Sequence, residues 1–130
     1  MTTYLFVTDP EKYDVESVTR STDSLWRWSC SKTVAPGDTA LVYLKGGEGI
    51  AYEWEIRSDA EPNKKWRYMC DVRLLRRFSP PIPLSEICST VSKTNWGAPH
   101  TNFRGFRSIR VPNLVAQQFR ALRARKRTQP

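Results

Sequence analysis

The sequence has few of the residues that metal centres and catalytic triads require. It contains one histidine, His100, and three cysteines, Cys30, Cys70 and Cys88. No C-x-x-C pair and no zinc-type spacing occurs, so we expect no metal and no cofactor. The odd, widely spaced cysteines argue against a secreted disulfide scaffold and favour a reducing compartment. A small hydrolase that pairs a cysteine with His100 is a less favoured alternative.

Long apolar runs are also missing. Met1 is followed by a polar dipeptide and a strand-like segment, without a basic n-region or an apolar h-region. No apolar stretch approaches the length that a bilayer requires. We therefore expect a cytoplasmic protein, complete at its N-terminus, with no membrane partner.

Two motifs of nucleotide and nucleic-acid enzymes are absent as well. The glycines at 46, 47 and 49 are not followed by the Lys-Ser/Thr of a phosphate-binding loop, and they indicate a hairpin turn. Asp59, Glu61 and Lys64 lie close together in a polar connection, with no second acidic cluster to complete a nuclease centre. Neither pattern supports a nucleotide-binding enzyme or a nuclease.

Positive charge is what the chain has in excess. Its 130 residues carry 21 lysines and arginines against 13 aspartates and glutamates, a formal charge of +8, and most of the excess lies in the second half. A chain of this length forms one domain that buries about two thirds of its unfolded surface. The charge, interleaved with aromatic residues, favours a nucleic acid as partner.

The order of elements predicts an α+β fold. Aromatic and β-branched runs predict strands at 3–8, 25–31, 39–44, 50–56, 66–78 and 109–111. Helices are expected at 10–21, 84–91 and 112–125, the first capped by Asp9, the second by Ser85, and the third with a core face of Val115, Phe119 and Leu122. Residues 79–83, with three prolines, should be neither helix nor central strand. Residues 92–108 are expected to form a polar loop, and residues 126–130 a frayed basic tail following a single domain at 1–125.

Period-two alternation assigns the side chains of 50–56 to two faces. Ile50, Tyr52, Trp54 and Ile56 share one face, which is buried or binds a ligand. The other face, with Ala51, Glu53 and Glu55, is expected to be solvated.

Tryptophan is unusually frequent, with five in the chain, of which we expect about two or three to be core. Trp26 and Trp28 are two positions apart, so in a strand they share a face, with Arg27 on the other. Trp66 follows Lys64 and Lys65. Indoles that line a slot can hold a nucleobase, and each stack contributes about 1–3 kcal/mol, enough for two of them to offset a base-flipping cost of a few kcal/mol.

Several segments resemble the EVE domain family, which belongs with the PUA-like and YTH-like folds. The resemblance spans residues 3–57, with a weaker closing segment at 95–105. The matching segments are Asp9-Pro10-Glu11-Lys12-Tyr13-Asp14 after an aromatic strand, Trp28-Ser29, Pro36-Gly37-Asp38-Thr39-Ala40-Leu41-Val42-Tyr43 and Gly49-Ile50-Ala51.

The resemblance implies a curved sheet or pseudo-barrel flanked by short helices, with a C-terminal helix. It also implies a non-catalytic reader that flips a modified base, a modified cytosine in DNA, into an aromatic pocket, as in modification-dependent restriction. Trp28 or Trp26 would form one wall of the pocket, and Trp54 or Trp66 the other. The chain shows no nuclease or motor domain, so it is expected to be either a stand-alone reader or one whose effector, a nuclease or motor, is a separate subunit.

The residues expected to act fall into two groups. Those expected to contact the base are Trp26, Trp28, Ser29, Tyr52, Trp54, Trp66 and Asn102. Those expected to hold phosphates are Lys64, Lys65, Arg67, Arg104 and Arg107. DNA is favoured over RNA, and a reader of RNA or of methylated adenine is the alternative.

Overall fold

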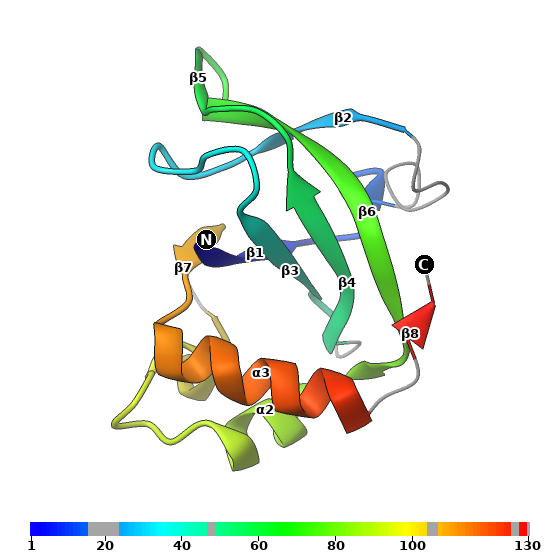
Figure 1. Cartoon of the computed structure of the whole chain (residues 1–130), viewed down its shortest axis with the longest axis vertical. Helices are drawn as coiled ribbons and strands as arrows, with labels where there is room; N and C mark the ends of the chain where they lie inside the picture. The colour runs from blue at the N-terminus through cyan, green and yellow to red at the C-terminus, as the bar shows by residue number, and fades with distance from the viewer. Residues whose placement is uncertain (16–23, 47–48, 104–106, 126–127, 130) are drawn as a thin grey trace.

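The chain forms one curled mixed sheet with short helices at one end (Figure 1). The computed structural model describes residues 1–15, 24–46, 49–103, 107–125 and 128–129. Among these residues, no helix is long and apolar enough to cross a membrane.

Eight strands make up the sheet, in the order β2-β6-β4-β3-β1-β7, with β5 and β8 also paired to β6. The strands β1 and β3 run parallel, and all other pairs are antiparallel. Their bounds are β1 Thr3–Thr8, β2 Trp26–Ser29, β3 Thr39–Leu44, β4 Gly49–Ile56, β5 Glu61–Asn63, β6 Arg67–Ile82, β7 Ser108–Arg110 and β8 Thr128–Gln129. The strands expected at 3–8 and 39–44 are confirmed to the residue.

Side-chain hydrogen bonds hold the two edges of the sheet together. β2 and β7 lie at opposite ends of the strand order, yet the hydroxyls of Ser31 and Ser108, just after β2 and in β7, are 2.7 Å apart. The Tyr4 hydroxyl of β1 likewise lies 2.9 Å from the Thr33 hydroxyl. Because β2 and β1 are separated by three strands, these contacts require the sheet to curl into a half-barrel.

Buried side chains form two clusters, one on each face of the sheet. We call the first the inner core; it contains Tyr4, Phe6, Val42, Trp54, Cys70 and Val72, with Trp28 packed against it. The second, the helix-side core, packs the sheet against the helices α2 (Leu84–Thr90) and α3 (Asn113–Arg125) and the 3-10 helix η1 (Ala98–Thr101). Val115, Phe119 and Leu122 are buried in it, which confirms the predicted core face of the last helix.

The predicted two-face alternation of 50–56 holds from Tyr52 to Ile56 and is wrong at its start, because β4 is bulged against β3. The pairing passes from Val42–Tyr52 to Tyr43–Ile50, so Ala51 is an extra residue in β4. An extra residue puts the residues on its two sides out of step with a regular alternation. Ile50 therefore lies in the helix-side core, whereas Ala51, Trp54 and Ile56 lie in the inner core with Tyr52 packed against it. Glu53, expected in solvent, is buried.

The longest strand also runs further than predicted. β6 continues through Ser79, Pro80 and Pro81 to Ile82, so the expectation that prolines end the strand is wrong. Pairing with β4 passes directly from Arg77 to Ile82, so the prolines fall where the ladder needs no backbone donor.

Three further expectations near the helices are corrected. Pro83, not Ser85, is the N-cap of α2, and it makes no side-chain capping bond. The polar loop at 92–108 contains η1, and Trp96 and Phe103 of this segment are buried in the helix-side core. Aromatic side chains of a loop can be buried when another element packs over them, and here Phe119 of α3 contacts Trp96.

The segment after β1 begins with a turn instead of the expected helix. The backbone N–H of Glu11 donates to the Asp9 carboxylate at 3.0 Å, and the N–H of Tyr13 donates to the Asp9 carbonyl at 3.0 Å. The rest of the predicted helix, from 16 onward, lies outside the described residues. In the expected tail, Thr128 and Gln129 form β8 against Phe78 and Arg77.

Candidate functional site

A cavity of about 450 Å³ lies where β1, β2, β3 and the β5–β6 turn converge. This volume is within the range of about 300–1,000 Å³ that is typical of small-molecule sites. The cavity is lined by Val7, Thr8, Asp9, Lys12, Tyr13, Asp14, Trp26, Arg27, Trp28, Ser29, Lys45, Trp66, Met69 and Arg107. Three of the five tryptophans therefore face one hollow.

The indoles of β2 enter the cavity with different degrees of support. Trp26 is 42% exposed and has no ring contact among the described residues. Trp28 is half-buried and packs edge to face on Trp54, with ring centroids 5.1 Å apart. Trp54 packs in turn on Phe6 at 6.2 Å. Trp54 is fully buried and does not line the cavity, so its expected place as a pocket wall is corrected: it supports Trp28 from the core.

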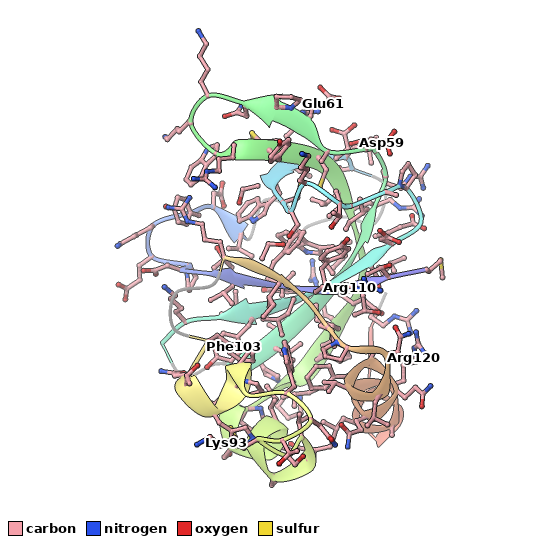
Figure 2. All side chains as sticks on the ribbon, turned by 90° about the vertical axis from the view of Figure 1, so that its left-hand side faces the viewer. Asp59, Glu61, Lys93, Phe103, Arg110 and Arg120 are labelled. Carbon is pink, nitrogen blue, oxygen red and sulfur yellow. The ribbon has the colours of Figure 1, made fainter. Side chains whose placement is uncertain are left out.

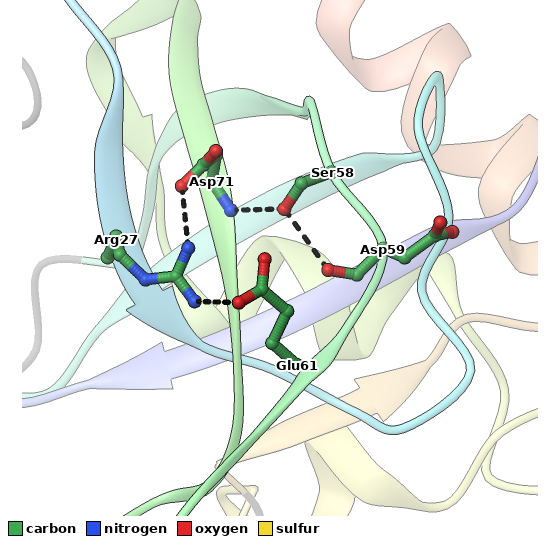
Figure 3. Close-up of polar contacts among 5 residues, drawn as sticks. All are labelled: Arg27, Ser58, Asp59, Glu61 and Asp71. Carbon is green, nitrogen blue, oxygen red and sulfur yellow. Dashed lines mark hydrogen bonds and ion pairs between the residues drawn. The ribbon is translucent and has the colours of Figure 1, made fainter.

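Ion pairs fix β2 to the strands beside it (Figure 3). Arg27 pairs with Asp71 of β6 at 3.1 Å and with Glu61 of β5 at 3.4 Å. The Ser58 hydroxyl accepts the backbone N–H of Asp71 at 2.8 Å and donates to the Asp59 carbonyl at 3.1 Å. These contacts fix the position of β2 relative to the β5–β6 hairpin. They also leave the Arg27 guanidinium bound to two carboxylates.

Trp66 is presented by a tight turn between β5 and β6. The Asn63 side-chain oxygen accepts the backbone N–H groups of Lys65 at 2.9 Å and Trp66 at 3.0 Å, as asparagine often does in turns. Arg67 completes the turn with φ +68°, in the left-handed region. This geometry projects Trp66 away from the sheet and into the cavity.

Three side chains surround the Trp66 ring. Tyr13 meets it edge to face, with centroids 5.5 Å apart. The Lys65 ammonium lies 5.1 Å from the ring centroid, and the Arg107 guanidinium carbon 5.2 Å from it. These are cation–π distances. Trp66 therefore has two cations beside its ring, whereas no cation of the described residues lies over the ring of Trp26.

The remaining predicted site residues are divided between the cavity and other places. Ser29 lines the cavity, whereas Tyr52 does not and packs beside the inner core. Asn102 accepts a hydrogen bond from the Tyr43 hydroxyl at 3.4 Å and does not line the cavity either. Lys64, Lys65 and Arg67 are exposed and lie outside the lining, although Lys65 reaches the ring of Trp66. Arg104 is outside the described residues.

Several lining residues were not predicted. Thr8, Asp9, Lys12 and Tyr13 come from the end of β1 and the turn that follows, and Lys45 comes from the end of β3. β1 and β3 are parallel, so their carboxyl ends meet at one edge of the sheet. The signal that could have found them is the polar Asp9-Pro10 turn directly after a buried strand, since turns at strand ends often carry binding residues.

The cysteines and the histidine lie outside the cavity lining. His100 donates from Nε2 to the Val91 carbonyl at 2.6 Å, and the Cys88 thiol donates to the Pro99 carbonyl at 3.4 Å. A hydrogen bond from the Cys70 thiol lowers the pKa of Cys30, while the same bond and burial raise the pKa of Cys70. Within the described residues, no group of His, Cys, Asp and Glu could hold a metal ion.

The sequence model of the EVE domain family matches residues 2–110, which include every residue that lines the cavity. The chain belongs to the EVE domain family. As an EVE domain it has the half-barrel with short helices that the resemblance implied, and the predicted fold class is confirmed.

Solved structures with the same fold have little sequence in common with this EVE domain. Human THYN1 in complex with DNA containing 5-methylcytosine superposes with a TM-score of 0.71 at 16% identity, covering 100% of both chains. A hypothetical protein from Leishmania major gives 0.75 at 15% identity over 96% of each chain. A protein from Pseudomonas syringae gives 0.73 at 16% identity, over 94% of this chain and 97% of its own. No curated protein sequence matches the chain.

Proposed function

We propose that this EVE domain is a non-catalytic module that binds DNA and takes a modified cytosine, flipped out of the duplex, into the cavity. The observation that carries the proposal is a cavity lined by three indoles and rimmed by cations in a domain of this family. The fold shared with human THYN1, whose structure holds DNA with 5-methylcytosine, supports the same class of ligand.

The base would be held chiefly by the β2 indoles. Trp26 offers an exposed ring, and Trp28 is fixed in place by its edge contact with the fully buried Trp54. Stacking on each ring contributes about 1–3 kcal/mol, and extruding a base costs a few kcal/mol. Two indoles are therefore enough to make extrusion favourable once phosphate contacts add to them.

The cations of the cavity would bind the backbone. Lys12, Lys45 and Arg107 line it, in a chain whose net charge is +8. Such contacts release counterions and give affinity that falls with salt but carries no sequence information. Discrimination would therefore come from the cavity, and affinity largely from its rim.

We assign the module to modification-dependent restriction, with a separate nuclease or motor subunit as effector. EVE domains are binding modules, which fits a division of labour between a reader and an enzyme on another polypeptide. Co-purification with such a subunit from the native host would support this part of the proposal, and binding to modified DNA with no associated nuclease or motor would contradict it.

Binding to a panel of oligonucleotides at fixed salt tests the proposal. Fluorescence titration would compare duplex DNA and RNA carrying one plain, methylated or hydroxymethylated cytosine, or one methylated adenine. We expect the tightest binding to a modified cytosine in DNA. Equal affinity for every oligonucleotide contradicts a reader of modified bases, and tighter binding to RNA or to methylated adenine identifies a different target.

A further inference from the structure

We infer that Trp66 is the support of a two-cation phosphate clamp formed by Lys65 and Arg107, and not a wall of the base slot. The inference rests on the proposed function, because it assigns the backbone phosphate beside the bound base to a defined part of the cavity rim. It also gives the two ends of the cavity different roles: β2 supplies the indoles for the base, and the clamp lies at the rim, with Arg107 from the segment before β7 in the lining and Lys65 from the β5–β6 turn just outside it.

The first argument is that the Trp66 ring is already occupied. Lys65 and Arg107 lie within cation–π distance of it, and Tyr13 meets it edge to face. A base that stacked on Trp66 would compete with these side chains for the ring. Trp26 and Trp28 have no cation over their rings among the described residues, so a base meets no such competitor there.

The second argument is electrostatic. Because both cations contact one ring, their charges are at most about 10 Å apart, near the distance over which salt screens charge at 0.1 M. Neither forms an ion pair with a carboxylate in the described parts of the chain, whereas Arg27, Arg57, Arg73 and Arg76 all do. Two cations without an ion-pair partner among the described residues lie beside one ring, and a phosphate that contacted both would offset their mutual repulsion.

The third argument concerns order. Long cationic side chains lose rotamer freedom when they bind, which weakens the net gain. The turn fixed by Asn63 positions Trp66, and the ring in turn restrains Lys65 and Arg107 before any ligand arrives. A phosphate diester, with charge-assisted hydrogen bonds to guanidinium and ammonium, is the anion that suits such a pair.

Trp66 is a positioning residue in this scheme, and its test must separate it from a stacking residue. The variants are Lys65→Ala, Arg107→Ala, Trp66→Leu and the double variant Trp66→Leu/Arg107→Ala. Arg120→Ala is the matched control, because Arg120 is exposed on α3 at the end of the molecule opposite Glu61 (Figure 2). For each, Kd is measured against salt for duplexes with one plain or one 5-methylated cytosine.

Four results are expected. Lys65→Ala and Arg107→Ala each reduce the slope of log Kd against log salt by about 1, and Arg120→Ala leaves it unchanged. Trp66→Leu weakens binding to both duplexes by the same factor, so their ratio stays at the wild-type value. Arg107→Ala weakens binding several-fold in the wild type but adds little to Trp66→Leu. Trp66→Phe keeps an aromatic face, so its affinity for both duplexes should stay near the wild-type value. It serves as the conservative variant in case Trp66→Leu loses binding because it is misfolded.

The clamp is overturned if Trp66→Leu lowers the ratio of the two affinities, if Arg107→Ala costs the same with and without Trp66, or if neither cation changes the salt slope. A wild-type ratio of one would instead overturn the proposed function, and the salt slopes on plain DNA would still decide the clamp. Inorganic phosphate at constant ionic strength should compete only weakly. Displacement of DNA by phosphate at concentrations near that of the protein would mark a free-phosphate site and overturn the assignment to the backbone.

Discussion

Trp26 is the residue on which the proposed base slot depends most. An indole in a residue that is 42% exposed contributes little to folding, and no aromatic ring or cation of the described residues lies against it. Truncation should therefore affect ligand binding far more than stability.

For Trp26→Ala we expect the affinity for duplex with a modified cytosine to fall roughly 5- to 150-fold, the loss of one stack of about 1–3 kcal/mol. Affinity for the plain duplex should change much less, and the melting temperature should hardly move. Leu25→Ala is the matched control, since Leu25 is 55% exposed and adjacent but does not line the cavity. An equal loss in the control, or an equal loss on both duplexes, would contradict a stacking role for Trp26.

Residue type identified the tryptophans as candidates for the site, but their burial decided which of them line the cavity. The sequence identifies Trp26 and Trp28 as neighbours on one face and Trp66 as close to lysines, and all three line the cavity. Trp54 also has aromatic and charged neighbours in the sequence, yet its strand, β4, lies between β6 and β3 and places it in the core. The place of a strand in a sheet follows from contacts between strands, so no local pattern predicts it.

The start of β4 is sensitive to single changes, because Gly49 lies against β6. Gly49 begins β4 with φ +99°, and a Cβ there would overlap the Ile82 carbonyl oxygen of β6. Gly46 has nearly the same backbone, φ +98°, but a Cβ at this position would meet no atom of the described residues within 4 Å, apart from its chain neighbours. Alanine at Gly46 would therefore meet backbone strain alone, whereas alanine at Gly49 would meet the same strain and a steric overlap.

Gly46→Ala should lower the free energy of unfolding by about 1–2 kcal/mol, the cost of a left-handed alanine. Gly49→Ala should lower it by at least about 2 kcal/mol more, because β4 and β6 must move apart as well. Urea unfolding of both variants measures the difference. Equal destabilisation would show that Ile82 does not pack on Gly49 as described.

At this scale the sequence predicted most strands and the C-terminal helix, because hydrophobic period and turn residues act locally. The prediction was wrong where pairing between strands overrides the local conformational preference of the residues. Pro80 and Pro81 stay in β6 because the pairing with β4 skips them, and the Asp9-Pro10 signal makes a turn before any helix begins.

The whole molecule determines the site through the curl of its sheet. β2 and β1 are far apart in strand order, and only closure of the half-barrel, with Ser31 against Ser108, brings Trp26 and Trp28 opposite the turn after β1. That closure depends on many tertiary contacts at once. For this reason the cavity as a set, including Thr8, Tyr13 and Lys45, could not be assembled from sequence alone.

The central claim is that the cavity receives a base removed from its pair. It is tested most directly by comparing wild-type affinity, at fixed salt, for two duplexes that carry the same 5-methylcytosine, one correctly paired and one mismatched. Unpairing costs less at a mismatch, so we predict tighter binding to the mismatched duplex, about tenfold for each 1.4 kcal/mol saved, and loss of this gain in Trp26→Ala. Equal or weaker binding to the mismatched duplex would contradict base extrusion.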